Sequence, residues 1–392
     1  GVNKDVLQFS GDMSLFGVFN TFGGGALERF SIFAMGIMPY ITASIIVQLL
    51  QMDVVPKFAE WAKQGEVGRR KLAQFTRYFT VALAFVQALA LSVGFNSLFP
   101  GLVPDPNVLT YLLIALVLTA GTTFLMWLGE QITAQGVGNG ISIIIFAGIV
   151  AAIPTGIQQL YLQYFQNAEE LFLSVVTVIG ILIAILLVTI GVIFVQQGLR
   201  KIPIQYAKRV VSRQTVGGQS THLPIKVNAA GVIPVIFAVA IFYTPRTIAG
   251  FFGDNAIAAW LLQVIDYANP IGGTIYALLI IAVTYFYTFV QVNPEKMAEN
   301  LKKQGGYIPG IRPGKNTQIY ITRILYRLTF VGALFLTAVS ILPIFFTTLA
   351  NLPPSVQIGG TGLLIVVGVA LDTVKQIESQ LIKRHYKGFI KQ

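Results

Sequence analysis

Side chains that could carry out catalysis are scarce and poorly placed in this sequence. It has 16 acidic residues, two histidines and no cysteine. Glu130 and Asp372 lie near the ends of apolar segments, while His222 and His385 lie far apart in basic, polar stretches. No Ser-His-Asp set, metal-ligand spacing or phosphate-binding glycine loop with a lysine can be assembled from these residues. The sequence therefore argues against an enzyme and predicts neither a metal nor another cofactor.

Branched aliphatic side chains, in contrast, recur at helical spacing. Ile37 and Ile41 are four residues apart, as are Ile141 and Ile145, so each pair lies on one face of a helix. A triple glycine (23–25) precedes the first pair. An isolated isoleucine in an apolar helix usually packs in a core or against lipid, and a triple glycine can be an ordinary turn. Spacing alone leaves both roles open.

The composition predicts an all-α polytopic membrane protein. The chain is 55% hydrophobic and only 11% charged, whereas soluble domains usually carry about 25% charged residues. About 20 apolar residues cross a bilayer as a helix, the only open-chain form that pairs all its backbone groups in lipid. Nine transmembrane helices are predicted, at about 31–51, 75–97, 108–130, 140–160, 171–196, 229–250, 271–292, 323–345 and 358–378.

The basic residues predict the orientation of these spans. Of the 27 Lys and Arg residues, 24 fall within four regions, 53–77, 198–226, 293–327 and 375–391. Nine alternating spans place all four regions on one face of the membrane, which the positive-inside rule makes cytoplasmic. Gly1 is then expected outside the cell and Gln392 inside.

Two cytoplasmic loops, 198–226 and 293–322, are longer than ordinary helix connections. Alternating apolar residues around a Gly-Gly pair predict a β-hairpin arm in the first loop. The second predicts a short helix over 295–303, followed by a tip rich in glycine and proline. These loops could simply orient the protein and contact anionic lipid. We favour a docking surface for a cytoplasmic partner, because orientation needs only short flanking charges.

Several long motifs, in this order, resemble the SecY family of bacterial protein-translocation channels. The resemblance implies ten spans, of which this chain would hold the second to tenth, with the first missing. It also implies two pseudo-symmetric halves, residues 1–160 and 161–392, around a central pore, with a cytoplasmic tail at 379–392. The motifs are GGALERFSIFAMGIMPYITASIIVQLL, GEVGRRKLAQFTRY, FLMWLGEQITAQGVGNGISIIIFAGIV, QSTHLPIKVNAAGVIP, AENLKKQGGYIPGIRPG and GGTGLLIVV.

The same resemblance assigns roles to the glycines and isoleucines. A plug over about 14–30 would close the external funnel, and the triple glycine would be its hinge, formed by Gly23, Gly24 and Gly25. A ring of isoleucines would line the narrowest part of the pore, where aliphatic side chains can block ions by dewetting. By motif, the ring consists of Ile37, Ile41, Ile141, Ile145, Ile236 and Ile365.

The resemblance further implies a gate, docking sites and partners. The span from Ser31 and the span from Ala229 would form a lateral gate for signal sequences, with Ser31 and Asn139 as small polar residues that help to hold it shut. Transmembrane segments would leave through this gate into lipid. The expected partners are the SecE and SecG subunits, the SecA ATPase motor and the ribosome, in the plasma membrane of a bacterium. The docking residues would be Arg312, Lys208, Arg209, Lys302 and Lys303.

Two other functions are alternatives to a protein-conducting channel. Spans interrupted by glycine and proline, with possible inverted halves, are also typical of small-solute secondary transporters. Such transporters usually carry ionisable residues within their spans, and no acid can be placed at a midplane here. A membrane receptor for nucleic acid rests only on the net charge of +11. The cytoplasmic location of the basic residues already explains that charge, so no direct DNA binding is expected.

Overall fold

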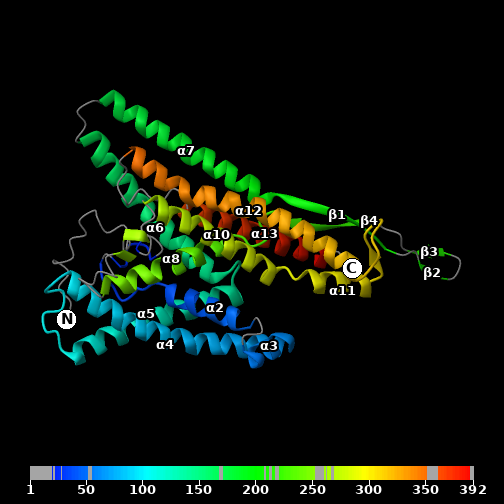
Figure 1. Cartoon of the computed structure of the whole chain (residues 1–392), viewed down its shortest axis with the longest axis horizontal. Coiled ribbons are helices and arrows are strands. Elements are labelled where there is room, and N and C mark those ends of the chain that lie inside the picture. The colour runs from blue at the N-terminus through cyan, green and yellow to red at the C-terminus, as the bar shows by residue number, and fades with distance from the viewer. Residues whose placement is uncertain are drawn as a thin grey trace.

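The computed structural model describes residues 20, 23–27, 29–51, 55–166, 171–206, 209–211, 214–216, 220–251, 260–261, 263–265, 269–350 and 361–388. Helices dominate this part of the chain, and a small β structure lies at one end of the molecule (Figure 1). The helices are α2 Met38–Leu50, α3 Pro56–Lys63, α4 Glu66–Leu98, α5 Val108–Gln135, α6 Gly140–Tyr161, the π-helical turn η2 Leu162–Gln166, α7 Leu171–Gln197, α8 Ile233–Phe251, α10 Pro270–Gln291, α11 Pro294–Lys303, α12 Lys315–Ala350 and α13 Thr361–Gly388.

Six helices in the described residues are long and apolar enough to cross a membrane, fewer than the nine spans predicted. They are α4, α5, α6, α7, α10 and α12. The helix α2 and the described apolar part of α8, Ile233–Phe242, are shorter apolar helices. The helix α13 becomes charged from Asp372 onward. Pro154 lies inside α6 without ending it, so the predicted 140–160 span is one helix.

The first predicted span begins later than expected, and the prediction of 31–51 was wrong at its start. The helix α2 begins only at Met38, and residues 32–37 form turns. Phe30 and Gly36 have positive φ angles, of 43° and 54°, which a right-handed helix cannot contain. Pro39 then lies in the first turn of α2, where its missing N–H costs no helical hydrogen bond.

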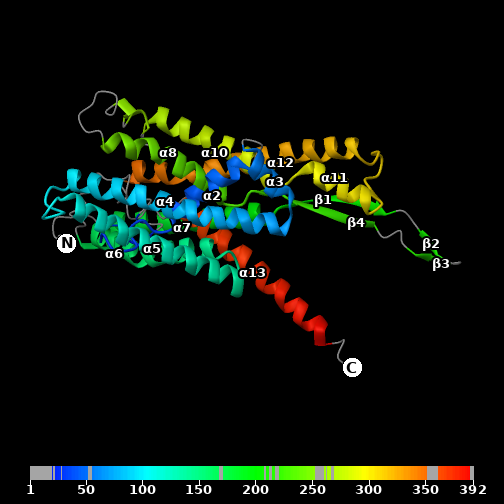
Figure 2. The ribbon, with the colours of Figure 1, turned by 90° about the horizontal axis from the view of Figure 1, so that it is seen from below.

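Other helices extend beyond the predicted spans. A window of apolar residues locates the segment that crosses the membrane, and the helix can continue into polar sequence on either side. The helix α4 starts at Glu66 instead of about 75, and its first turns hold an Arg70–Glu66 pair of 3.1 Å. Likewise α12 starts at Lys315, within the predicted 293–322 loop. The predicted 379–392 tail is helical as far as Gly388, because α13 continues past the helix bundle (Figure 2).

The two long loops form a single β structure, the sheet unit, made of strands β1, β4 and β5 together with α11. The predicted hairpin arm is confirmed: β1 (Leu199–Tyr206) pairs antiparallel with β4 (Ser220–Lys226). Between them, β2 (Arg209–Val211) pairs with β3 (Gln214–Val216) and projects away from the helices (Figure 2). The sequence did not predict β5 (Gly306–Tyr307), which comes from the second loop and pairs with the end of β1.

The sheet unit has its own apolar core, which fixes it on α12. The predicted short helix is confirmed as α11, whose N-terminus is capped by Asn293 Oδ1, accepting from the N–H groups of Glu295 and Lys296 at 3.0 and 3.1 Å. Strand side chains of β1 and β4 pack against α11 and α12. The buried residues of this core are Ile202, Ile204, Ile225, Leu301, Ile308, Ile321 and Leu325.

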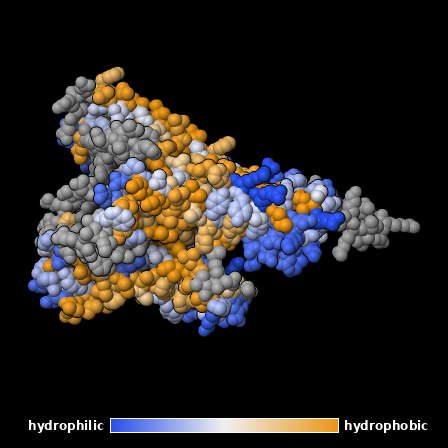
Figure 3. All heavy atoms as spheres, in the orientation of Figure 1, coloured by the Kyte–Doolittle hydropathy of each residue, from blue (hydrophilic) through white to orange (hydrophobic). Residues whose placement is uncertain are grey.

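The surface divides the molecule into an apolar body and a polar end. Hydrophobic residues cover the helical body, and hydrophilic residues gather over the end that carries α11 and the strands (Figure 3). The helix α7 is the extreme case, since Phe172 at its start is 82% exposed. Exposed apolar surface on this scale is not found on a water-soluble monomer and is typical of a helix that faces lipid.

Candidate functional site

All six predicted pore isoleucines lie in or against one apolar cluster, and they come from α2 with the residue before it, α6, α8 and α13. Ile37 caps the start of α2 and Ile41 follows one turn later, while α8 contributes Ile236 and α13 contributes Ile365. These four side chains are at most 7% exposed, and Ile365 is fully buried. The two isoleucines of α6 complete the set: Ile145 is also buried, and Ile141 packs against the cluster from its edge.

The apolar cluster also contains residues that the motifs did not identify. Among them are two aromatic pairs that join α8 to α10. Phe237 of α8 packs edge-on against Tyr287 of α10, with ring centroids 5.5 Å apart. One further turn along α8, Phe242 packs against Tyr276 at 5.2 Å. The apolar periodicity of α8 and α10 is compatible with lipid contact as well as with a core. The sequence therefore gave no signal that would separate these side chains from lipid-facing ones.

A glycine-rich turn sets the position of the α6 isoleucines. A Cβ atom on Gly140 would lie 1.9 Å from the carbonyl oxygen of Gly129, so only glycine allows α5 and α6 to approach this closely. The Gly140 N–H donates to Thr133 Oγ1 at 2.8 Å. Asn139 Oδ1 accepts from the N–H of Ile141 at 3.1 Å and caps the first turn of α6. The turn thus holds the beginning of α6 against α5.

The two predicted gate residues make their side-chain hydrogen bonds within their own turns. Ser31 Oγ accepts from the N–H of Phe33 at 3.2 Å, and the Ser31 N–H donates to the carbonyl oxygen of Ala26 at 3.0 Å. Asn139 caps α6, as described above. The structure therefore places both side chains as local turn stabilisers, with no hydrogen bond between them among the described residues. The helices α2 and α8 do contact each other, through aliphatic side chains of the isoleucine cluster.

Most of the predicted plug, 14–30, lies outside the described residues, but the predicted hinge does not. Gly24 and Gly25 have φ angles of +65° and +80°, in the left-handed region that favours glycine. A Cβ on Gly24 would lie 3.3 Å from the Cα of Gly148, so the hinge passes close to α6. The chain is anchored directly after the hinge, because Leu27 and Phe30 are buried in a second cluster with side chains of α4 and α5.

Polar contacts link the helix ends around the site. Arg77 of α4 donates to Glu130 of α5 at 2.7 Å. On α13, Asp372 lies 3.6 Å from Lys226 at the end of β4, and Gln376 accepts from the N–H of Gly138 at 2.8 Å. The side chains at these positions are partly exposed, so each contact holds an orientation more than it adds stability.

Three of the predicted docking residues lie at the end of α11 and just before α12, a region called the docking tip below. Arg312, Lys302 and Lys303 are exposed, and the hydroxyl of Thr317 donates to the Arg312 carbonyl oxygen at 3.1 Å. A hydrogen bond from Lys303, together with the charges of Lys303 and Lys302, lowers the pKa of Glu299 from its ordinary value. Arg209 belongs to β2, and Lys208 lies outside the described residues.

Comparison with known proteins identifies the family of this chain. The family model for SecY matches residues 31–374. The protein translocase subunit SecY of Halalkalibacterium halodurans is 72% identical over the whole of this chain and 91% of its own length. That of Bacillus subtilis is 67% identical with the same coverage. The chain belongs to the SecY family.

Solved structures agree at the level of the fold. A protein-conducting channel aligns over 95% of this chain and 87% of its own, with a TM-score of 0.59 and 20% identity. A SecY structure concerned with the plug domain and the closed channel aligns over 96% and 93%, with a TM-score of 0.58 and 20% identity. Sec61 from a canine ribosome–channel complex covers 95% and 87%, with a TM-score of 0.56 and 16% identity.

SecY membership confirms the main functional prediction. The chain is a protein-conducting channel subunit, a multi-pass protein of the bacterial plasma membrane, and not an enzyme. The small-solute transporter considered above has no support from these relatives.

Proposed function

We propose that the isoleucine cluster is the constriction of the channel, through which unfolded polypeptides cross the membrane. The observation that carries this proposal is the convergence of Ile37, Ile41, Ile141, Ile145, Ile236 and Ile365 from four helices that are far apart in sequence. Branched aliphatic side chains offer no hydrogen bonds, so they exclude water and ions when packed together. They can part around a moving chain without selecting its sequence. SecY uses no chemistry of its own in this mechanism.

The plug at about 14–30 would add a second barrier on the external side. Its hinge, at the triple glycine, passes α6 next to Gly148, and the buried Leu27 and Phe30 fix the chain beyond it. Motion would then be confined to residues before 26. A related SecY structure is described as having a plug domain that stabilises the closed state, which supports this role.

The lateral gate would open between α2 and α8, with the aliphatic contacts between them as its seal. A signal sequence is itself an apolar helix, so it can replace these contacts at little cost in buried area. Transmembrane segments would leave by the same route. Any bond that Ser31 or Asn139 makes across the gate during opening would be small, about 0.6–2 kcal/mol.

The chain would contribute the second to tenth of ten spans, in two pseudo-symmetric halves, 1–160 and 161–392. The six long apolar helices, together with α2, α8 and α13, supply nine helices in the expected order within the described residues. The basic sheet unit would face the cytoplasm, as would the C-terminus, by the positive-inside rule. SecE would hold the halves together, and SecG would bind at the periphery.

The sheet unit would receive the SecA motor or the ribosome, which supply the energy. Arg312, Lys302 and Lys303 are exposed, and Arg209 belongs to β2. Lys208, which lies outside the described residues, would act with Arg209. Sec61 in a ribosome–channel complex shares the fold, which supports docking of this kind. Contacts of these cations with ribosomal phosphates would weaken as the salt concentration rises.

Crosslinking tests the constriction directly, because the chain has no cysteine of its own. Ile37→Cys and Ile236→Cys would be made singly and reconstituted with SecE and SecA, and a secretory precursor would be stalled midway. We expect ATP-dependent crosslinks from both positions. The matched control is Leu186→Cys on the exposed face of α7, which should give none. If crosslinks from positions 37 and 236 were no stronger than those from position 186, the isoleucines would be core packing residues and would not line the path of the polypeptide.

A further inference from the structure

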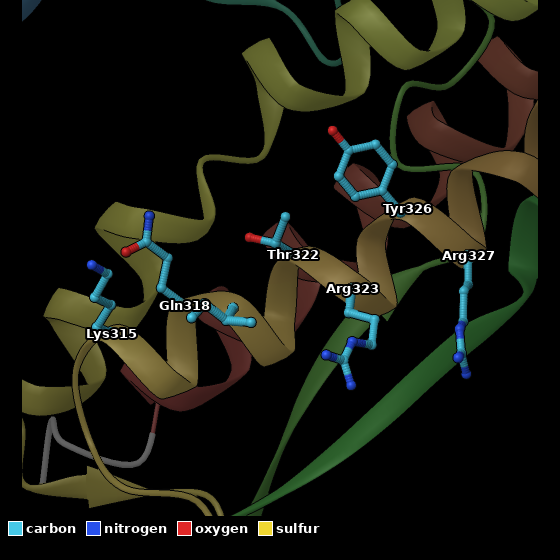
Figure 4. Close-up of a pocket in the computed structure, with 7 residues that line it drawn as sticks. Lys315, Gln318, Thr322, Arg323, Tyr326 and Arg327 are labelled. Atoms are coloured by element: carbon cyan, nitrogen blue, oxygen red, sulfur yellow. The ribbon is translucent and has the colours of Figure 1, made fainter.

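We propose that the beginning of α12 carries a binding site for the headgroup of an anionic phospholipid. An open groove of about 620 Å³ lies there, lined by side chains of this helix. Figure 4 shows Arg323 and Arg327 extending from one side of α12, with Thr322 and Tyr326 on the other. The remaining lining residues are Lys315, Gln318 and Ile319. This site lies outside the constriction and the docking tip, and goes beyond the proposed function.

The two arginines are available for an anion. Both are exposed, and the ion pairs found among the described residues all use other cations. They are four residues apart, so their guanidinium groups project from successive turns of one helix face. Two planar guanidinium groups at this spacing can bind the oxygens of one phosphate from two sides.

The face of α12 that follows Arg327 is apolar and exposed. Its position next to two cations indicates the class of ligand. Phe330, Val331 and Leu334 are 52%, 55% and 47% exposed, and they continue the same stripe at i+3, i+4 and i+7 from Arg327. At 1.5 Å per residue, the stripe starts about 5 Å beyond Arg327. A ligand that satisfies both parts must carry a phosphate and hydrocarbon side by side. A phospholipid does so, whereas a nucleic acid or a free phosphate does not.

Tyr326, next to the arginines, indicates how deep in the membrane the site lies. The ring of Tyr326 packs on Phe289 of α10 with centroids 4.7 Å apart, and the hydroxyl of Tyr285 donates to the Tyr326 carbonyl oxygen at 3.3 Å. Amphipathic aromatic side chains gather at the level of the lipid headgroups. The long arginine side chains can also reach this level while their stems lie along apolar surface. The site therefore lies where the predicted span of α12, about 323–345, would enter the membrane.

Fluorescence quenching by brominated lipids tests the site. Leu334→Cys would be labelled with a small fluorophore, and the chain would be reconstituted with SecE and SecG in phosphatidylcholine vesicles. These would contain brominated phosphatidylglycerol or brominated phosphatidylcholine at equal fractions. Each cation near an anionic headgroup is worth roughly a fivefold preference. We therefore expect phosphatidylglycerol to be preferred at least about fivefold at position 334.

Paired variants separate charge from packing. R323Q/R327Q should bring the preference at position 334 to about one, and R323K/R327K should keep most of it because the charges remain. The control label at Leu186→Cys, on an apolar face of α7, should report a ratio of about one throughout. A preference that survives R323Q/R327Q would overturn the proposal.

Two further outcomes would also overturn it. If millimolar inorganic phosphate removed the preference, the groove would be a general phosphate site and not a lipid site. If neither lipid quenched the label at position 334 while both quenched the label at position 186, a protein segment would cover the stripe. Retention of the preference in phosphate, with quenching at both positions, would establish the lipid site.

Discussion

The backbone N–H of Gly138, in the turn before α6, donates a 2.8 Å hydrogen bond to Oε1 of Gln376 on α13. This bond joins segments 238 residues apart, one in each proposed half of the channel. One turn earlier on α13, Asp372 pairs with Lys226 of the sheet unit. The middle of α13 is therefore tied both to the turn before α6 and to the β1–β4 arm. Because α6 and α13 both supply isoleucines to the proposed constriction, this contact connects two of the helices that would form it.

Removing the acceptor at Gln376 should loosen the closed channel. Gln376→Leu keeps the side-chain size but leaves the Gly138 N–H without this partner, at a cost of about 1 kcal/mol for an ordinary hydrogen bond. We expect more transport of precursors with defective signal sequences, measured in SecA-driven vesicle assays. Gln376→Glu retains an acceptor oxygen and should behave like the parent. If the two variants transported these precursors equally, the hydrogen bond between Gly138 and Gln376 would have no part in gating.

Polar substitution in the constriction should make the closed channel leak. In Ile37→Asn or Ile236→Asn, a buried amide without a partner costs about 1–3 kcal/mol, enough to raise the open population roughly tenfold. The expected result is increased ion conductance across planar bilayers. Ile236→Leu keeps the apolar volume and serves as the control. If the Asn and Leu variants had the same conductance, another element would provide the seal.

Charge reversal at the docking tip should stop translocation without unfolding the protein. Arg312 is exposed, so Arg312→Glu should change stability by no more than about 0.5 kcal/mol. Transport driven by SecA should be lost, and Arg312→Lys should retain part of it. Thermal unfolding of the purified variants checks the first statement, and vesicle transport checks the second. Normal transport by Arg312→Glu would show that SecA does not dock at Arg312.

Two glycine substitutions in membrane helices should have opposite effects. A Cβ at Gly140 would lie 1.9 Å from the Gly129 oxygen, so Gly140→Ala should separate α5 from α6 and cost about 3 kcal/mol or more. A Cβ at Gly180 of α7 meets nothing within 4 Å, and Gly180→Ala should stabilise the helix by up to about 1 kcal/mol. Thermal unfolding in detergent measures both. Similar melting temperatures for the two variants would contradict the close approach of α5 and α6.

The parts of this structure that the sequence predicted are those with a local physical signal. Apolar windows located the six long apolar helices of the described residues, and alternation around Gly-Gly located the β1–β4 arm. The isoleucines at 37 and 41 could be identified as a pair by spacing, but their convergence with Ile236 and Ile365 came only from the family resemblance. Spacing describes one helix at a time, and cannot say which helices meet.

The missed features all depend on contacts distant in sequence or on single backbone angles. The pairing of β5 with β1 joins residues about a hundred positions apart, and two residues carry no strand pattern. The late start of α2 follows from the positive φ of Gly36, which composition does not reveal. Ser31 and Asn139 are predicted to hold the lateral gate shut, whereas the side-chain hydrogen bonds found here go to the neighbouring N–H groups of Phe33 and Ile141.

The pairing of β5 with β1 has a mechanical consequence. It connects the tip that carries Arg312 to both long loops at once, and those loops are continuous with α7 and α8 on one side and with α10 and α12 on the other. A force applied at the tip is therefore distributed over four helices. A motor that pushes there would move this group as one rigid body, and would not tilt a single helix.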